Sequence, residues 1–277
     1  MQQVMLADGA MMPKLGMGTW HMGERARDEA AEIQALRHGL DLGIGMIDTA
    51  EMYGDGGAEK VVAQAIAGRR DAVFLVSKVY PHNASARGAI AACERSLTRL
   101  GTDHIDLYLL HWRGSIPLEQ TLSAFERLVR DGKIGRWGVS NLDVDDMREL
   151  AALDNGHNCA LDQVYYSLSQ RGVEHDLLPW LEAHSMPLMA YCPLDQGALV
   201  RDPVLGRIGR EHGASAAQIA IAWLMSRPGV VPIPKAGRLQ HVEELAGSDA
   251  IKLTAQDLLD IDQRFPAPAR RQPLMIV

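Results

Sequence analysis

Short apolar runs alternate with longer segments of helical periodicity from about residue 16 to residue 265. Apolar runs bounded by turn residues predict buried β-strands, and the amphipathic segments between them predict helices. Strands that alternate with helices form parallel sheets. The predicted strands end near Gly18, Ile47, Lys78, Leu110, Val139, Val164, Ala190 and Ile233. Eight such units in succession predict an α/β fold, the (β/α)8 TIM barrel.

Six segments carry the helical pattern, and several of them begin with Asp or Ser, which are favoured N-caps. They are Asp28–Leu42, Glu59–Ala67, Ser85–Leu100, Leu118–Asp131, Asp143–Leu153 and Ala214–Ser226. No linker or low-complexity stretch divides the repeat, so residues 1–277 are expected to form a single domain. An open doubly wound sheet is the alternative, but its G-x-G-x-x-G fingerprint does not match the first strand, Leu15–Trp20.

Two terminal segments lie outside the repeat. Residues 1–14 are predicted to form a β-hairpin over Val4–Met12, with Asp8-Gly9 as a type I′ turn, that closes the bottom of the barrel. Residues 263–277 are rich in Pro and Arg and are predicted to form a short tail. The sequence does not place this tail, which could reach the rim of the active site.

Composition narrows the classes of function. The 28 Lys and Arg residues against 35 Asp and Glu residues give a net charge of −7, which argues against nucleic-acid or anionic-membrane partners. The three cysteines, Cys93, Cys159 and Cys192, are too widely spaced to indicate a disulfide framework or a metal site. No signal segment or apolar run of roughly 18 residues is present. We therefore expect a soluble cytoplasmic protein.

Four unlike ionisable residues lie close to the ends of predicted strands. Asp48, Lys78 and His111 each end or follow a strand, and Tyr53 comes shortly after Asp48, before the turn-prone segment Gly54–Gly57. Because the carboxyl ends of all TIM-barrel strands open onto one face, these side chains are expected to converge. A free tyrosine has a pKa of ~10, which a neighbouring lysine is expected to lower. Asp48 would then orient Lys78, while His111 could position a substrate oxygen or relay a proton.

Each of the four residues also has a plainer interpretation when taken alone. Asp48 could be a helix N-cap, with Thr49 assisting, and Lys78 could be a solvated strand end. His111 could be a core histidine, and Tyr53 could be an aromatic residue of the rim. Their joint placement at successive strand ends favours one active site.

The segment Asp48-Thr49-Ala50-Glu51-Met52-Tyr53-Gly54 resembles the Asp-Thr-Ala-x-x-Tyr-Gly motif of the aldo-keto reductases. Lys78 and His111 stand where the catalytic tetrad of that family has its lysine and histidine. The resemblance covers nearly the whole chain and implies carbonyl reduction by a nicotinamide cofactor, with Tyr53 as the general acid. Histidine at position 111 favours carbonyl reduction, since relatives that reduce steroid double bonds carry glutamate there. Within the family, the chain is most similar to small bacterial methylglyoxal-type reductases.

The resemblance also implies a cofactor site. Further matches are Trp137–Asn141, Gln163, Ala190–Leu194 and Ile233–Lys235. The implied cofactor-binding positions are Gly18, Thr19, Trp20, Asp48, Ser140, Asn141, Gln163, Tyr191, Pro193, Leu194, Lys235, Arg238, His241 and Glu244. Side chains of Ser, Asn and Gln can hydrogen-bond a carboxamide, and a tyrosine ring can stack on nicotinamide. Taken singly, Tyr191 could be a core residue and Ser140-Asn141 a loop or helix cap.

The segment from Lys235 to His241 bears on the choice between NADPH and NADH. In the NADPH-preferring pattern of the family, serine often follows the lysine, and arginine lies five residues beyond that serine; here these places hold Ala236 and His241. Lys235 supplies one cation for the extra 2′-phosphate of NADPH, and Arg238 could supply another. We therefore expect NADPH rather than NADH, although the segment could also be a solvated basic loop.

The candidate substrate-binding residues are Trp20, Tyr80, His111 and Trp112. The three aromatic residues and Met52 follow strand ends and could form an apolar wall, or could simply pack at the rim. The short segment between His111 and Leu118 and the short tail predict an open site for small aldehydes, ketones or dicarbonyls such as methylglyoxal.

Two other classes of function compete with this interpretation. A cofactor-sensing regulatory subunit, as in the potassium-channel β subunits that resemble this family, would show little turnover. A barrel hydrolase fits poorly, because no clustered metal ligands or activated Ser or Cys nucleophile is evident. We expect no metal, and a monomer or a weak homo-oligomer.

Overall fold

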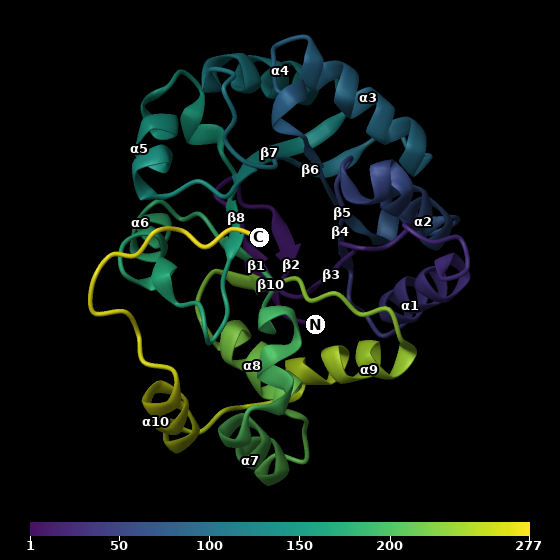
Figure 1. Ribbon diagram of the computed structural model, residues 1–277. Coiled ribbons are helices and arrows are strands. Elements are labelled where there is room, and N and C mark those ends of the chain that lie inside the picture. Colours follow the sequence, from purple (N-terminus) through teal and green to yellow (C-terminus); the bar gives the residue numbers. More distant parts are fainter.

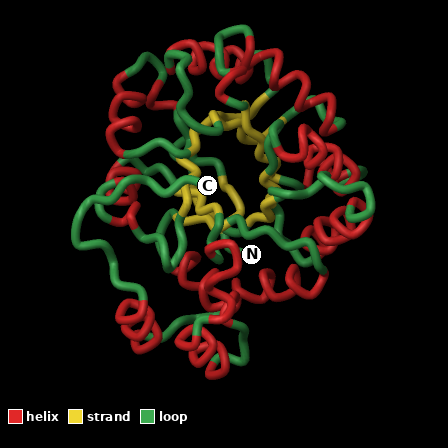
Figure 2. Tube along the Cα trace, viewed as in Figure 1, coloured by secondary structure: helices red, strands yellow, loops and turns green.

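The computed structural model covers residues 1–277 and contains an eight-stranded parallel sheet surrounded by helices (Figures 1 and 2). Its strands are β3 (Gly16–Gly18), β4 (Met46–Asp48), β5 (Phe74–Val79), β6 (Ile105–Leu110), β7 (Ile134–Ser140), β8 (Asp162–Tyr165), β9 (Leu188–Tyr191) and β10 (Val230–Pro232). They pair in sequence order, and the Gly18 N–H donates to the Pro234 carbonyl at 3.0 Å, which joins the first strand to the last. The predicted TIM barrel is therefore confirmed, with each strand end within one residue of its predicted position.

Ten helices accompany the strands. They are α1 (Glu29–Asp41), α2 (Gly57–Ile66), α3 (Gly88–Leu100), α4 (Leu118–Arg130), α5 (Val144–Ala152), α6 (Leu177–Ala183), α7 (Pro203–Glu211), α8 (Ala216–Ser226), α9 (Leu239–Gly247) and α10 (Ala255–Arg264). All six predicted helices are present, and Asp143 and Ser215 begin α5 and α8 with capping boxes. None of the ten has the length and apolar character that crossing a bilayer requires.

The apolar core has two layers. A cluster of 63 buried residues includes the outward-facing strand positions and the helix faces that cover them. A smaller cluster of 11 residues lies inside the barrel, where Met46, Val76 and Leu107 meet Leu6 and Met12 of the N-terminal segment. The hairpin of β1 (Gln3–Met5) and β2 (Met11–Pro13) thus plugs one end of the barrel, as predicted, because Leu6 and Met12 are fully buried there.

The turn of this hairpin differs from the prediction. A type I′ turn needs positive φ at both central residues, but only Gly9 has it, at 83°. The Leu6 N–H donates to the Ala10 carbonyl and the Gly9 N–H to the Leu6 carbonyl, each at 2.9 Å. The loop therefore has three residues, 7–9, with the left-handed residue last, and the predicted type I′ turn at Asp8-Gly9 is wrong.

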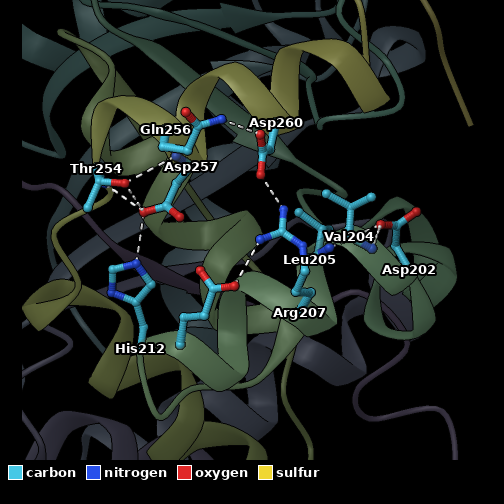
Figure 3. Close-up of polar contacts among 10 residues, drawn as sticks. Asp202, Val204, Leu205, Arg207, His212, Thr254, Gln256, Asp257 and Asp260 are labelled. Atoms are coloured by element: carbon cyan, nitrogen blue, oxygen red, sulfur yellow. Dashed lines mark hydrogen bonds and ion pairs between the residues drawn. The ribbon is translucent and has the colours of Figure 1, made fainter.

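Helices α7 and α10 pack together outside the ring (Figure 3). Arg207 pairs with Asp260, and His212 Nε2 lies 2.9 Å from Asp257 Oδ2. Asp257 also belongs to the capping box that starts α10 at Thr254. These contacts fix the helix from which the C-terminal segment departs.

After α10 the C-terminal residues cross the mouth of the barrel, and the C-terminus lies over its centre (Figure 1). Arg271 holds this segment by ion pairs with Asp143 (3.3 Å), Asp145 (2.7 Å) and Asp176 (3.0 Å). The tail, whose path the sequence did not indicate, therefore reaches the rim on the side of β7 and β8.

Candidate active site

The ends of β4, β5 and β6 bring Asp48, Tyr53, Lys78 and His111 together. Lys78 is fully buried, and its Nζ donates to Asp48 Oδ2 at 2.7 Å and to the Thr49 carbonyl at 2.9 Å. The same Nζ lies 3.3 Å from Tyr53 Oη. The His111 ring meets the Tyr53 ring edge to face, with centroids 5.6 Å apart. Four side chains from three strand ends thus share one centre, as the sequence predicts.

The backbone after Tyr53 explains how its ring turns toward this centre. Gly54, Asp55 and Gly56 have positive φ values of 57°, 52° and 81°. Three successive left-handed residues reverse the chain tightly, and glycine adopts this conformation without steric cost. At Gly56 a Cβ atom would also lie 2.6 Å from the Arg99 side chain. The turn after Tyr53 therefore depends on its glycines.

The electrostatics of Tyr53 differ from the prediction. Burial and the Asp48 carboxylate, together with Cys192, raise the pKa of Tyr53 well above its usual value, whereas Lys78 was expected to lower it. The reason is that Asp48 neutralises Lys78 at close range and that the site excludes water, which disfavours the phenolate. Burial also lowers the pKa of Lys78. The prediction of a depressed tyrosine pKa is therefore wrong, and Tyr53 holds its proton firmly.

His111 is buried and electrically neutral at ordinary pH. Burial and the nearby charge of Lys78 hold its pKa well below the usual range. Its Nδ1 is buried without a hydrogen-bond partner. Of the two roles left open by the sequence, a neutral ring favours positioning a substrate oxygen over relaying a proton.

Polar side chains at the ends of β7, β8 and β9 adjoin this centre. Gln163 Nε2 donates to Asp48 Oδ1 at 2.8 Å, and Asn141 Nδ2 donates to the His111 carbonyl at 3.1 Å. The Tyr191 hydroxyl donates to Asn141 Oδ1 at 2.8 Å, and the Ser140 hydroxyl donates to the Gln163 carbonyl at 2.7 Å. The structure thus brings these four predicted cofactor residues into one network with Asp48.

Comparison with known proteins agrees with this geometry. The model of the "Aldo/keto reductase family" matches residues 14–264. The chain belongs to the aldo/keto reductase family. It is 50% identical to "Methylglyoxal reductase YeaE" of Escherichia coli (strain K12) over 100% of both chains. A crystal structure of an aldo-keto reductase from Klebsiella pneumoniae in complex with NADPH has 48% identity and a TM-score of 0.97, covering 100% of this chain and 99% of that one.

A second Klebsiella pneumoniae structure, an aldo/keto reductase in complex with NADP and acetate, is 49% identical and has a TM-score of 0.96 over 99% of both chains. These likenesses extend over the barrel and both terminal segments of this aldo/keto reductase. Family, enzyme class and fold therefore agree with the expectations from sequence.

Gly18 ends β3, and Thr19 and Trp20 follow it, on the side of Asp48 away from β5. The Thr19 hydroxyl and backbone N–H both donate to the Asp48 carbonyl at 3.0 Å. A Cβ atom at Gly18 would lie 2.8 Å from the Ile233 carbonyl, so only glycine allows this closure of the barrel. Trp20 stacks on His21 with centroids 4.2 Å apart and makes no ring contact with the other predicted wall residues.

Tyr80 and Trp112 do form a continuous aromatic surface with His111. Tyr80 meets Trp112 edge to face at 4.9 Å, and Trp112 meets His111 at 4.9 Å. Tyr80 also stacks on His82 at 4.4 Å. Met52 is 40% exposed. Ring contacts thus make the predicted apolar wall continuous from Tyr80 through Trp112 to His111, and Trp20 takes no part in them.

In the segment Lys235–His241 the side chains of Lys235, Arg238 and His241 are exposed to solvent. The side chains of Lys235, Arg238 and His241 make no hydrogen bond or ion pair within the chain. The first backbone bond of α9 runs from the Val242 N–H to the Arg238 carbonyl, so the preceding amides of the helix are open. Glu244 accepts a hydrogen bond from Ser215 Oγ at 3.3 Å. The free donors here suit an anionic group at the helix N-terminus.

Pro193 and Leu194, two of the implied cofactor-binding positions, lie in the loop that follows β9. Its neighbours Cys192, Asp195 and Gln196 all have positive φ, between 49° and 52°. The Tyr165 hydroxyl donates to Asp195 Oδ1 at 2.5 Å, which ties this loop to β8. The sequence did not single out Tyr165 or Asp195. The available signal is that Tyr165 directly follows a strand predicted to end near Val164, as Asp48 follows one predicted to end near Ile47.

Proposed function

We propose that this protein reduces small aldehydes, ketones or dicarbonyls to alcohols with NADPH, and that Tyr53 is the general acid. The observation that carries the proposal is the position of Lys78 Nζ, 2.7 Å from Asp48 Oδ2 and 3.3 Å from Tyr53 Oη. A cation held there by a buried carboxylate stabilises a phenolate at the moment it forms. A tyrosine that served only as a packed aromatic residue of the rim would not require a lysine and a carboxylate at these distances.

Several observations support NADPH as the cofactor, which when bound supplies the hydride. The network of Ser140, Asn141 and Gln163 offers donors and acceptors for a carboxamide, and the half-buried ring of Tyr191 offers a flat surface. Lys235 and the open amides of α9 suit the 2′-phosphate. Relatives of 48% and 49% identity were crystallised with NADPH and NADP.

The raised pKa of Tyr53 is compatible with this role. A phenol that holds its proton at neutral pH is in the form needed by an acid, and transfers the proton only as negative charge develops on the substrate oxygen. Lys78 then faces the resulting phenolate, and Asp48 keeps the lysine charged and in place. The neutral His111 ring orients the carbonyl oxygen before transfer.

The proposed substrates are small carbonyl compounds, with methylglyoxal as the first candidate. A relative that is 50% identical over its full length is a methylglyoxal reductase. The wall formed by Tyr80 and Trp112 is short and partly exposed, which suits a small substrate. Three free thiols, Cys93, Cys159 and Cys192, suit action in a reducing cytoplasm. We propose a monomer or a weak homo-oligomer.

The test is to follow the absorbance of NADPH, and separately of NADH, with a panel of aldehydes, ketones and dicarbonyls. We expect oxidation of NADPH with methylglyoxal and other small carbonyl compounds, at a higher kcat/KM than with NADH. If none of the panel is reduced with either cofactor although the protein binds NADPH, catalysis is refuted and a cofactor-sensing role is favoured.

A further inference from the structure

Glu51, two residues before Tyr53, makes contacts that the chemistry above does not use. Its side chain is only 8% exposed, and Oε1 accepts hydrogen bonds from the Tyr80 backbone N–H at 2.7 Å and from Asn83 Nδ2 at 3.0 Å. Oε2 lies 3.5 Å from Arg95 Nη2. A buried carboxylate with two hydrogen bonds to one loop is a structural contact and not a solvated surface charge.

The backbone of Glu51 is joined to the same loop. Its N–H donates to the Lys78 carbonyl at 3.3 Å, and its carboxylate reaches Tyr80, which directly follows the last residue of β5. The Tyr80 N–H lies past the end of the strand ladder and would otherwise have no partner in the chain. Glu51 therefore fastens the loop that carries Tyr53 to the loop that carries Tyr80.

Aromatic contacts lead from the Tyr80 loop back to Tyr53. From Tyr80 the edge-to-face contacts run to Trp112 at 4.9 Å, to His111 at 4.9 Å and back to Tyr53 at 5.6 Å. Edge-to-face pairs hold ring planes in defined relative orientations. A shift of the Tyr80 backbone is therefore transmitted through Trp112 to the imidazole that faces Tyr53.

We propose that Glu51 is a positioning residue that fixes the Tyr80–Trp112 wall relative to Tyr53 and His111. The inference rests on the proposed carbonyl reduction and adds a determinant of substrate placement to it. The Glu51 side chain makes no hydrogen bond or ion pair with Asp48, Tyr53, Lys78 or His111, so it acts through Tyr80. What the site requires of residue 51 is a hydrogen-bond acceptor at this place, because both short contacts converge on one oxygen.

The requirement for an acceptor separates two substitutions. Glu51→Ala removes the acceptor and leaves the Tyr80 N–H unpaired, so the wall can move. Glu51→Gln keeps a carbonyl oxygen that can accept from the same donors but removes the charge. Glu119→Ala is the matched control, since Glu119 is an exposed glutamate near the start of α4 with no side-chain bond.

The experiment measures kcat and KM for methylglyoxal, the Kd for NADPH by fluorescence titration, and Tm, for the wild type and all three variants. We expect Glu51→Ala to lower kcat/KM about tenfold, mainly through KM, because small misplacements of a substrate wall have large effects. NADPH affinity should change less than about twofold, as should every parameter of Glu119→Ala. Glu51→Gln should recover most of the loss. A crystal structure of Glu51→Ala should show the Tyr80–Trp112 contact lengthened.

Two results would overturn the inference. One is a Glu51→Ala variant whose KM matches the wild type; the other is a Glu51→Gln variant as impaired as Glu51→Ala, which would show that charge and not acceptor geometry matters. If Glu51→Ala does not fold, Glu51→Gln is compared with Asn83→Ala, which removes one donor to Glu51 Oε1. A KM raised in Asn83→Ala but not in Glu51→Gln supports the inference, and wild-type KM values in both variants overturn it. A wild type without carbonyl reductase activity would refute the proposed function itself, a different outcome from an active enzyme indifferent to residue 51.

Discussion

The tetrad and the segment Lys235–His241 both place charged side chains at the mouth of the barrel, and they are built in opposite ways. Lys78 and Asp48 are buried and bonded to each other, to Thr49 and to Tyr53 within the chain. The side chains of Lys235, Arg238 and His241 are exposed and have no partner within the chain. Charges that act on a reacting atom gain from preorganisation in a site that excludes water. Charges that capture a phosphate need only be accessible, and are screened by salt.

The largest effect is expected from the buried pair. Lys78→Met should lower kcat by about 10²- to 10⁴-fold, because the phenolate formed from Tyr53 loses its cation. It also leaves the Asp48 carboxylate buried without its partner, which is expected to cost about 3–5 kcal/mol in the free energy of unfolding. Steady-state kinetics and urea unfolding measure both effects. A variant that turns over like the wild type would contradict the account of the tetrad.

The pH profile tests the same region by its pKa shifts. The pKa of Tyr53 is raised, so its proton-bearing form persists to higher pH than in a free tyrosine. The pKa of His111 is lowered well below its usual value, so the ring stays neutral into the acid range. We expect kcat/KM for reduction to be flat across neutral pH, with no acid limb near ~6.5 and a basic limb above ~10. A limb near neutrality that His111→Gln abolishes would show a titrating histidine.

A smaller effect is expected from the exposed segment. Lys235→Ala should weaken NADPH binding by about tenfold, change NADH binding little and leave kcat nearly constant at saturating cofactor. The loss should shrink as ionic strength rises, because the lost contact is solvent-exposed. Fluorescence titrations at two salt concentrations measure it. Equal losses for the two cofactors would place the 2′-phosphate elsewhere.

The smallest expected effect is a gain in NADPH affinity. His241→Arg should tighten NADPH binding by about threefold, because arginine can bind a phosphate with two hydrogen bonds and stays charged. The matched control is NADH, which lacks the phosphate and should bind as before. A titration without any gain for NADPH would remove position 241 from this site.

The buried region was also the easier one to predict from sequence. Apolar runs end at Asp48, Lys78 and His111, and the fixed geometry of parallel strands brings such ends together. The direction of the Tyr53 pKa shift was not predictable, because the sequence shows a neighbouring cation but not the extent of burial or the neutralisation by Asp48. The turn at Gly9 was misjudged because Asp-Gly marks a turn without fixing the number of residues in its loop.

The other features that the sequence did not predict depend on contacts between segments far apart along the chain. The path of the tail depends on Arg271 and its ion pairs with Asp143, Asp145 and Asp176. Helices α7 and α10 are short, and their pairing through Arg207 and Asp260 joins residues far apart in sequence (Figure 3). The role of Glu51 likewise appears only when the Tyr80 N–H is seen to point at it. None of these has a local sequence signal.

The most direct test of the central claim is the rate of methylglyoxal reduction by Tyr53→Phe under saturating NADPH, with the Kd for NADPH measured on the same preparation. Phenylalanine keeps the ring that packs against His111 and removes only the hydroxyl beside Lys78. We predict that kcat falls about 10³-fold while NADPH binding changes less than about twofold. Turnover equal to that of the wild type would show that another group donates the proton.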